Sequence, residues 1–356
     1  MRLDVPIPPG AEERAHRVAM AAFASHRPAP KRRNHWRPAI ALAAVAAVVG
    51  VLASPPGRSV IHAIREAVGV KKAQKELFAL PAPGRLLVNS QAGAWVVEQD
   101  GSKRLLGPYR EASWSPFGRF VVALKGDELV TMEPNGKVHW TLARPGLRLP
   151  AWGGRHDDTR IAYLSSRNLH VVAGDGSGDS ARCADGVAQV EPAWQPGSLS
   201  MLAFAANDRV AVYDVTSCRQ LFVRTTPSPR RLEWSRDGKL LLVVSGIGAD
   251  VYDLDGNVVA ERVGVRDATF VGRTHRLAVL RSADVYDLGS QPLFHADGLR
   301  QVVSSPDGQW LLLTWPAADQ WVFVRVASPH TIRAFSGISS QFGGGKFPEV
   351  SGWIGK

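Results

Sequence analysis

Cysteine is scarce in this sequence, with only 2 among 356 residues, and the 10 histidines are scattered. Two thiols cannot build a multi-disulfide scaffold or a four-thiolate zinc site. No two histidines lie four residues apart, the spacing that places two metal ligands on one helix face. We therefore expect no metal site.

Motifs that carry catalysis are also missing. The sequence has no Gly-x-Ser-x-Gly nucleophile turn and no Gly-Lys-Ser/Thr phosphate loop. The glycine-rich run at 174–179 follows a predicted strand but opens no apolar helix, which is typical of a hairpin turn and not of a dinucleotide site. We expect no catalytic residues, no cofactor and no enzyme activity.

Acidic residues are outnumbered, and the excess positive charge is unevenly placed. The formal net charge is +11, of which residues 1–83 carry +8 and residues 84–356 carry +3. A nucleic-acid-binding protein concentrates lysine and arginine on its folded domain. Here the basic residues gather before a hydrophobic segment, so we expect a membrane and no nucleic acid as a partner.

That hydrophobic segment, residues 38–53 (PAIALAAVAAVVGVLA), contains no charge. As a helix it would span ~24 Å, which makes a short transmembrane segment. Basic residues without acids before it favour a cytoplasmic N-terminus. We expect a basic cytoplasmic tail at 1–37, a transmembrane helix at 38–53 and an exported C-terminal domain. A signal peptide cleaved near Ala53 is the alternative, and it exports the same domain.

Short helices are expected on both sides of this segment. In residues 54–83, Ile61, Ile64 and Val68 share one helical face among basic residues, which predicts an amphipathic helix near the membrane surface. A proline-rich linker at 81–84 follows it. Residues 10–25 predict a further short helix within the tail.

From Gly84 onward the sequence repeats with a period of about 40 residues. An aromatic residue is followed by a tight turn, as in 114–118 (WSPFG) and 234–238 (WSRDG), and serine first with glycine fourth is typical of a type I turn. The seven anchors of the repeat are Trp114, Trp152, Trp194, Trp234, Phe270, Ser304 and Trp353. We expect them to be structural, packed between neighbouring units and not part of a ligand site.

Each anchor turn precedes an apolar run, such as 240–244 (LLLVV), and then a second strand with a hairpin turn. Short strands at this spacing predict an all-β propeller. The first unit lacks an anchor, and the last anchor, Trp353, lacks a unit, so we expect the two ends of this region to complete one blade. Residues 84–356 are therefore predicted to form a seven-bladed β-propeller, with six or eight blades as alternatives.

The two cysteines, Cys183 and Cys218, lie one repeat apart. In an exported domain they would pair if their Cα atoms come within ~7 Å. Two free thiols are the alternative, and the sequence favours neither.

The turn motifs at 114–118, 234–238 and 304–308 resemble the blades of TolB-like and WD40-like propellers, and the resemblance covers residues 84–356. The Gly-His pair of WD40 blades is absent, so their polar tetrad is not expected here. The whole chain resembles an actinobacterial-type single-pass membrane protein. In some proteins of that architecture the cytoplasmic tail is an anti-sigma module, which would make a sigma factor the partner of residues 1–37, although this tail is shorter than the usual module.

We therefore predict a membrane-anchored, extracytoplasmic propeller that senses a small ligand or a protein, and that signals through its tail as an anti-sigma-like regulator. Its binding site is expected at the mouth of the central channel, where loops of many blades converge. One alternative is an envelope scaffold, as the TolB resemblance implies. The other is a propeller enzyme, a hydrolase or a quinoprotein-like oxidoreductase, which carboxylates or histidines clustered at the channel mouth would favour.

Overall fold

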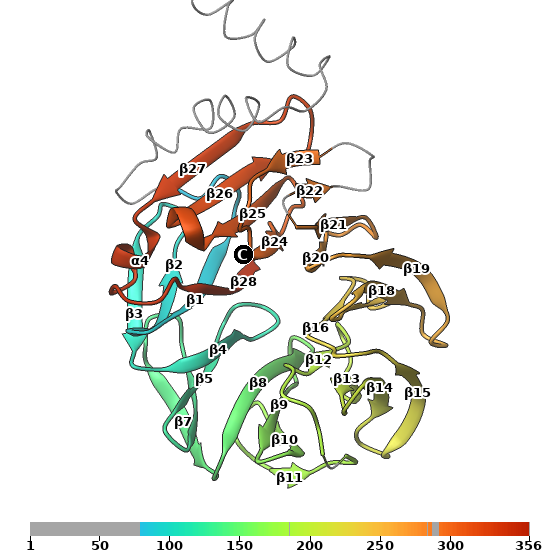
Figure 1. Cartoon of the computed structure of the whole chain (residues 1–356). Helices are drawn as coiled ribbons and strands as arrows, with labels where there is room; N and C mark the ends of the chain where they lie inside the picture. The colour runs from blue at the N-terminus through green and yellow to red at the C-terminus, as the bar shows by residue number, and fades with distance from the viewer. Residues whose placement is uncertain (1–78, 185, 283, 287–291, 356) are drawn as a thin grey trace, which may run out of the picture. The chain divides into compact units, whose positions relative to one another are not determined.

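The computed structural model of the chain describes residues 79–355 except 185, 283 and 287–291. Seven four-stranded antiparallel sheets are arranged around a central axis (Figure 1), each with its first strand innermost. Each blade contacts the next through its inner strands, and the last blade contacts the first, so the ring is closed. The all-β, seven-bladed propeller predicted from the repeats is confirmed.

Each blade extends from an inner strand at the channel to an outer strand at the rim. In that order, blade 1 consists of β28 (Glu349–Ile354), β1 (Arg85–Ser90), β2 (Gly93–Val97) and β3 (Lys103–Gly107). Blade 2 consists of β4 (Arg110–Trp114), β5 (Val121–Lys125), β6 (Glu128–Met132) and β7 (Val138–Ala143). Blade 3 consists of β8 (Leu147–Gly154), β9 (Thr159–Ser165), β10 (Asn168–Ala173) and β11 (Ser180–Ala181). Blade 4 consists of β12 (Ala193–Trp194), β13 (Met201–Ala205), β14 (Arg209–Asp214) and β15 (Arg219–Thr225).

Three blades complete the ring. Blade 5 consists of β16 (Arg231–Trp234), β17 (Leu241–Val244), β18 (Gly248–Tyr252) and β19 (Val258–Val263). Blade 6 consists of β20 (Asp267–Phe270), β21 (Leu277–Leu280), β22 (Asp284–Tyr286) and β23 (Pro292–His295). Blade 7 consists of β24 (Gln301–Ser304), β25 (Trp310–Trp315), β26 (Gln320–Arg325) and β27 (Ile332–Ser336). A short 3₁₀ helix, η1 (Pro316–Ala318), connects β25 to β26, and α4 (Ile338–Gln341) lies between β27 and β28.

The ring closes through the two ends of the propeller sequence. Strand β28 pairs antiparallel with β1, so that Leu86 lies opposite Trp353. Blade 1 therefore takes its inner strand from the C-terminal end and its other three strands from the N-terminal end. In this shared blade the inner edge of β1 is covered by β28 and is not left open.

In blades 2, 5 and 7 a buried serine stabilises the turn between the first and second strand. The Ser235 hydroxyl donates to the Asp237 carboxylate over 2.7 Å and accepts from the Leu240 backbone N–H over 3.0 Å. Gly238 donates its N–H to the Ser235 carbonyl over 2.8 Å at a φ of 70°, which disfavours any residue with a Cβ. The same bonds recur at 305–310, which explains why the turn sequence repeats.

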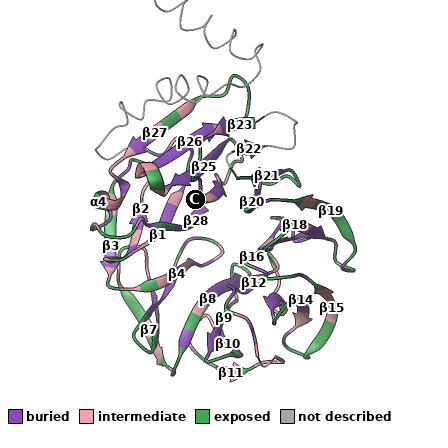
Figure 2. Cartoon of the chain, in the orientation of Figure 1, coloured by how far each residue is buried: buried purple, intermediate pink, exposed green. Residues whose placement is uncertain are grey.

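The core lies between adjacent blades. Each large cluster of buried side chains combines apolar residues of two neighbouring sheets, such as Leu87 and Val96 of blade 1 with Trp114 and Val121 of blade 2. Figure 2 shows buried residues along the inner and middle strands and exposed residues along outer strands such as β15 and β19. Burial on both faces explains why the second strands read as continuous apolar runs.

Several sequence-based predictions fall on residues that the structure does not describe. These are the tail at 1–37, the transmembrane helix at 38–53, and residues 54–78 of the predicted amphipathic segment. No helix within the described residues is long and apolar enough to span a bilayer. The end of the predicted linker packs onto the propeller, because Leu80 and Ala82 are buried in the cluster between blades 7 and 1.

Candidate functional site

The predicted repeat anchors lie at or next to the ends of the inner strands, away from the channel. The five tryptophans and Phe270 are all less than 9% exposed and pack between blades. The indole N–H of Trp194 donates to the Ala151 carbonyl over 3.1 Å, and that of Trp234 donates to the Ala193 carbonyl over 3.0 Å. Ser304 instead accepts the Gly272 N–H over 2.9 Å, at a junction where the backbones of blades 6 and 7 approach closely.

The two cysteines form a disulfide, with Cα atoms 5.1 Å apart. Cys183 follows β11 of blade 3, and Cys218 lies in the turn between β14 and β15 of blade 4. The bond therefore links two neighbouring blades. It lies where blade 3 has the weakest outer pairing, since β11 has only two residues.

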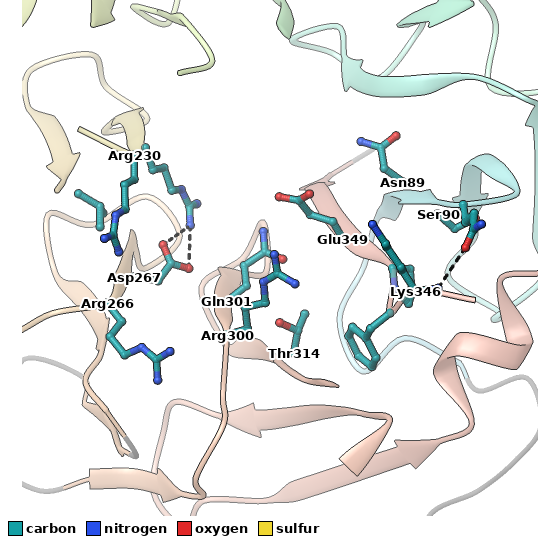
Figure 3. A pocket seen from close by; sticks show the side chains of 15 residues that line it. Asn89, Ser90, Arg230, Arg266, Asp267, Arg300, Gln301, Thr314, Lys346 and Glu349 are labelled. Carbon is teal, nitrogen blue, oxygen red and sulfur yellow. Dashed lines mark hydrogen bonds and ion pairs between the residues drawn. The ribbon is translucent and has the colours of Figure 1, made fainter. Parts of the chain in front are cut away.

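A cavity of about 750 Å³ opens at the centre of the ring, on the side where the inner strands begin. Blades 5, 6, 7 and 1 line it. Figure 3 shows Arg230 and Arg266 on one side, Glu349 and Lys346 on the opposite side, and Arg300 between them. The turn between β1 and β2 contributes Asn89, Ser90 and Gln91 to the wall. The volume of the cavity lies in the range of small-molecule binding sites.

The arginines of this cavity occupy one repeated position, four residues before the anchor. Arginine stands there in five of the seven repeats, at Arg110, Arg148, Arg230, Arg266 and Arg300. In blades 5, 6 and 7 its backbone N–H donates to a carbonyl at or next to the end of the second strand, over 2.8, 2.7 and 2.9 Å. Because this backbone hydrogen bond is the same in the three blades, the side chains of Arg230, Arg266 and Arg300 start from equivalent positions on successive blades.

Two of the five arginines have an acidic partner inside the protein. Arg110 and Arg148 both form ion pairs with Glu111, over 3.2 and 2.8 Å. Arg230, Arg266 and Arg300 differ, since all three are exposed and form no side-chain hydrogen bond or ion pair within the described part of the chain. The cationic charge of the ring is therefore partly compensated on blades 2 and 3, whereas the arginines of blades 5 to 7 have no ion-pair partner within the described residues.

The position next to these arginines forms the channel wall. Arg231 binds both carboxylate oxygens of Asp267 over 3.1 and 3.2 Å, and Glu233 over 2.6 Å. Asp267 also accepts the Val302 N–H over 2.8 Å. Burial disfavours the Arg231 charge, but Asp267 and Glu233 outweigh it and raise the pKa of the guanidinium. Gln301 continues the chain of contacts by donating to the Val350 carbonyl over 2.8 Å. Blades 5, 6, 7 and 1 are thus joined along the channel.

Glu191 of blade 4 faces the same channel. The side chain is exposed to channel water, yet protein surrounds it, and this loss of bulk solvent raises the pKa of Glu191 to about 7. A hydrogen bond with Ser113 opposes the shift, and the nearby Glu349 carboxylate adds to it. Glu191 therefore titrates near neutral pH at the centre of the ring.

Sequence reasoning did not identify these arginines, although a signal was present. The spacing of arginine four residues before Trp114, Trp152, Trp234, Phe270 and Ser304 can be read once the anchors are aligned. What the alignment does not show is which arginines are already paired. Residues 346–348 carry no repeat signal, because they belong to the irregular connection into β28. Glu349 is the first residue of that strand and stands four residues before Trp353, where five other repeats have arginine.

The chemical groups around the cavity are suited to binding. Guanidinium, ammonium, amide and hydroxyl groups line it, beside the ring of Phe347. Within the described residues, no cluster of three histidine, cysteine, aspartate or glutamate side chains could hold a metal ion.

Comparison with known proteins shows the fold. No protein-family model matches the sequence, and no curated protein sequence matches it. The β-propeller domain of Cps50 (Swd1) from Myceliophteria thermophila is similar with a TM-score of 0.54 at 12% identity, over 72% of this chain and 97% of that one. KlHsv2 with loop 6CD replaced by a Gly-Ser linker is similar with a TM-score of 0.51 at 11% identity, over 70% of this chain and 93% of that one. These likenesses show the fold alone, a β-propeller, which has seven blades in this chain.

Proposed function

We propose that this protein is a binding module without enzyme activity, which captures its ligand or partner at the cavity where the channel opens. The cavity with three unpaired arginines is the observation that carries this proposal. Charged side chains without internal partners line a concave site, which is typical of a recognition surface.

The location we propose is outside the cytoplasm, with residues 38–53 as a membrane anchor and residues 1–37 in the cytoplasm. The disulfide supports an oxidising compartment, since such bonds persist in exported proteins and are rare in the cytosol. The basic residues before the apolar segment support the orientation. Treatment of intact cells with a membrane-impermeant protease tests this topology, which predicts cleavage of the propeller and protection of a tag at the N-terminus.

A binding experiment tests the site. We expect full-length protein in detergent to be stabilised thermally by at least one compound of a panel of anionic, neutral and cationic small molecules. Gln91→Trp would fill the edge of the cavity from an exposed position and abolish the stabilisation, while Arg219→Trp on the outer strand β15 would leave it intact. Binding that survives Gln91→Trp unchanged would place the ligand elsewhere and contradict the proposal.

Signalling through the tail is a further part of the proposed function. The support is the resemblance to single-pass proteins whose cytoplasmic tail holds a sigma factor. We expect a sigma factor to co-purify with the full-length chain and to be lost when residues 1–25 are deleted, a deletion that keeps the basic residues next to the apolar segment. Equal recovery of the sigma factor with the full-length chain and with the shortened chain would contradict this part of the proposal.

A further inference from the structure

We propose that the cavity at the channel mouth binds a small ligand carrying at least two oxyanion groups, phosphate or carboxylate, through Arg230, Arg266 and Arg300. This inference rests on the proposed function and names the chemistry of that site. The three guanidiniums lie on successive blades, at equivalent backbone positions, and all line the cavity. We name these three residues the arginine arc.

No carboxylate of the described residues forms an ion pair with the arginine arc. Of the acids near the cavity, Asp267 binds Arg231 and the Val302 N–H, while Glu233 binds Arg231 and the Phe270 N–H. Glu349 lines the opposite side of the cavity. Asp267 and Glu233 therefore compensate Arg231 and not the arc. Like charges held on one rim repel one another, and a bound anion relieves that repulsion.

Blades 2 and 3 provide an internal comparison. There the equivalent arginines, Arg110 and Arg148, share Glu111, whose other oxygen accepts the Leu149 N–H over 2.6 Å. The protein thus holds a carboxylate between two successive arginines of the same ring. A ligand carboxylate or phosphate between two arginines of the arc would repeat an arrangement that the chain itself contains.

The geometry favours a ligand with more than one anionic group. Guanidinium presents a planar fork of N–H donors that binds phosphate or carboxylate oxygens in pairs. The arc extends over three blades, and the cavity is large enough for a phosphorylated sugar or a tricarboxylate. Glu349, exposed on the opposite side, would accept a hydroxyl or ammonium hydrogen of the same ligand (Figure 3).

Titration calorimetry on full-length protein in detergent tests the inference. The probes are citrate, fructose 1,6-bisphosphate and inositol hexakisphosphate as soluble ligands, uncharged fructose as a control, and vesicles containing phosphatidic acid as a source of lipid headgroups. We expect at least one phosphate or carboxylate probe to bind and fructose not to bind. Binding by the soluble probes indicates a free metabolite, and binding by the vesicles alone indicates a lipid headgroup.

Variants locate the site. Each of Arg230→Gln, Arg266→Gln and Arg300→Gln is expected to weaken binding about 10-fold or more, since each removes charge-assisted hydrogen bonds, and the triple variant is expected to lose it. The matched control is Arg104→Gln, Arg209→Gln and Arg219→Gln combined, which removes the same charge from exposed positions that do not line the cavity. The control is expected to bind within twofold of the parent chain.

Two results would overturn the inference. One is equal binding of the probes by the triple variant and the parent chain, with melting curves showing both to be folded. The other is binding at the mouth, blocked by Gln91→Trp, of uncharged or cationic ligands only. The second result would contradict the oxyanion ligand but would agree with the proposed function, a binding site at the channel mouth. Binding that is unchanged in Gln91→Trp would contradict the proposed function itself.

Discussion

Arg231 of blade 5 binds both carboxylate oxygens of Asp267 on blade 6, over 3.1 and 3.2 Å, at the wall of the central channel. The pair joins two blades at the point where their inner strands begin. Asp267 is 7% exposed, so its carboxylate is largely shielded from water. The contact also pairs these two charges with each other, whereas the arginine arc has no ion-pair partner within the described residues.

Replacing Asp267 with alanine is expected to lower the free energy of unfolding by about 2 kcal/mol, because the partly buried guanidinium of Arg231 loses one of its two carboxylate partners. The Val302 N–H loses its acceptor as well. Urea denaturation measures the loss. The double variant Arg231→Met, Asp267→Val should recover most of it, and a double variant as unstable as Asp267→Ala would refute the pairing argument.

Trp234→Phe is expected to cost about 1 kcal/mol more than Trp152→Phe. Both changes keep an aromatic ring between blades, but only Trp234 donates its indole N–H, to the Ala193 carbonyl. The Trp152 indole nitrogen has no hydrogen-bond partner within the described residues. Denaturant midpoints of the two variants give the comparison, and equal losses would show that the hydrogen bond contributes nothing.

Reducing the disulfide between Cys183 and Cys218 is expected to lower stability by about 3 kcal/mol, since the bond closes a loop across two blades. The Cys183→Ser, Cys218→Ser variant should show the same loss. Thermal melts with and without a reductant measure it. If the reductant destabilises the double variant as much as it destabilises the parent chain, the effect of the reductant does not come from this disulfide.

Stability is expected to fall as the pH rises from about 4.5 to about 7, through the titration of Glu191. Its pKa in the folded chain is about 7, raised from an ordinary 4.5, so in this window the folded chain keeps a proton that the unfolded chain has released. Glu191→Gln removes the effect. Because channel water screens the carboxylate, we expect the variant to be more stable than the parent by about 1 kcal/mol at pH 8 and equal to it near pH 4.

Urea titrations at several pH values between 4 and 8 check this difference. Glu128→Gln on the exposed start of β6 removes the same charge and serves as the control. A parent-to-variant difference that stays constant over this range would show that Glu191 does not titrate in the channel.

The propeller could be predicted from the sequence because the residues that form its turns and strands recur as short local patterns. In blades 2, 5 and 7 the turn uses a buried serine and a glycine in left-handed conformation, so residues such as Ser235 and Gly238 recur at the spacing of the blades. The missing anchor of the first unit and the unmatched Trp353 then predicted that the two ends of the propeller sequence share one blade. The apolar runs follow from burial on both faces of each sheet.

The binding site could be predicted only in part, since its cations repeat but their partners do not. The sequence alone determines that an arginine stands four residues before the anchor in five repeats. Only the tertiary structure decides that Arg110 and Arg148 meet Glu111, while Arg230, Arg266 and Arg300 meet no acid of the described chain. An ion pair depends on a through-space distance of a few ångströms between residues of different blades, and no spacing along the chain encodes that distance.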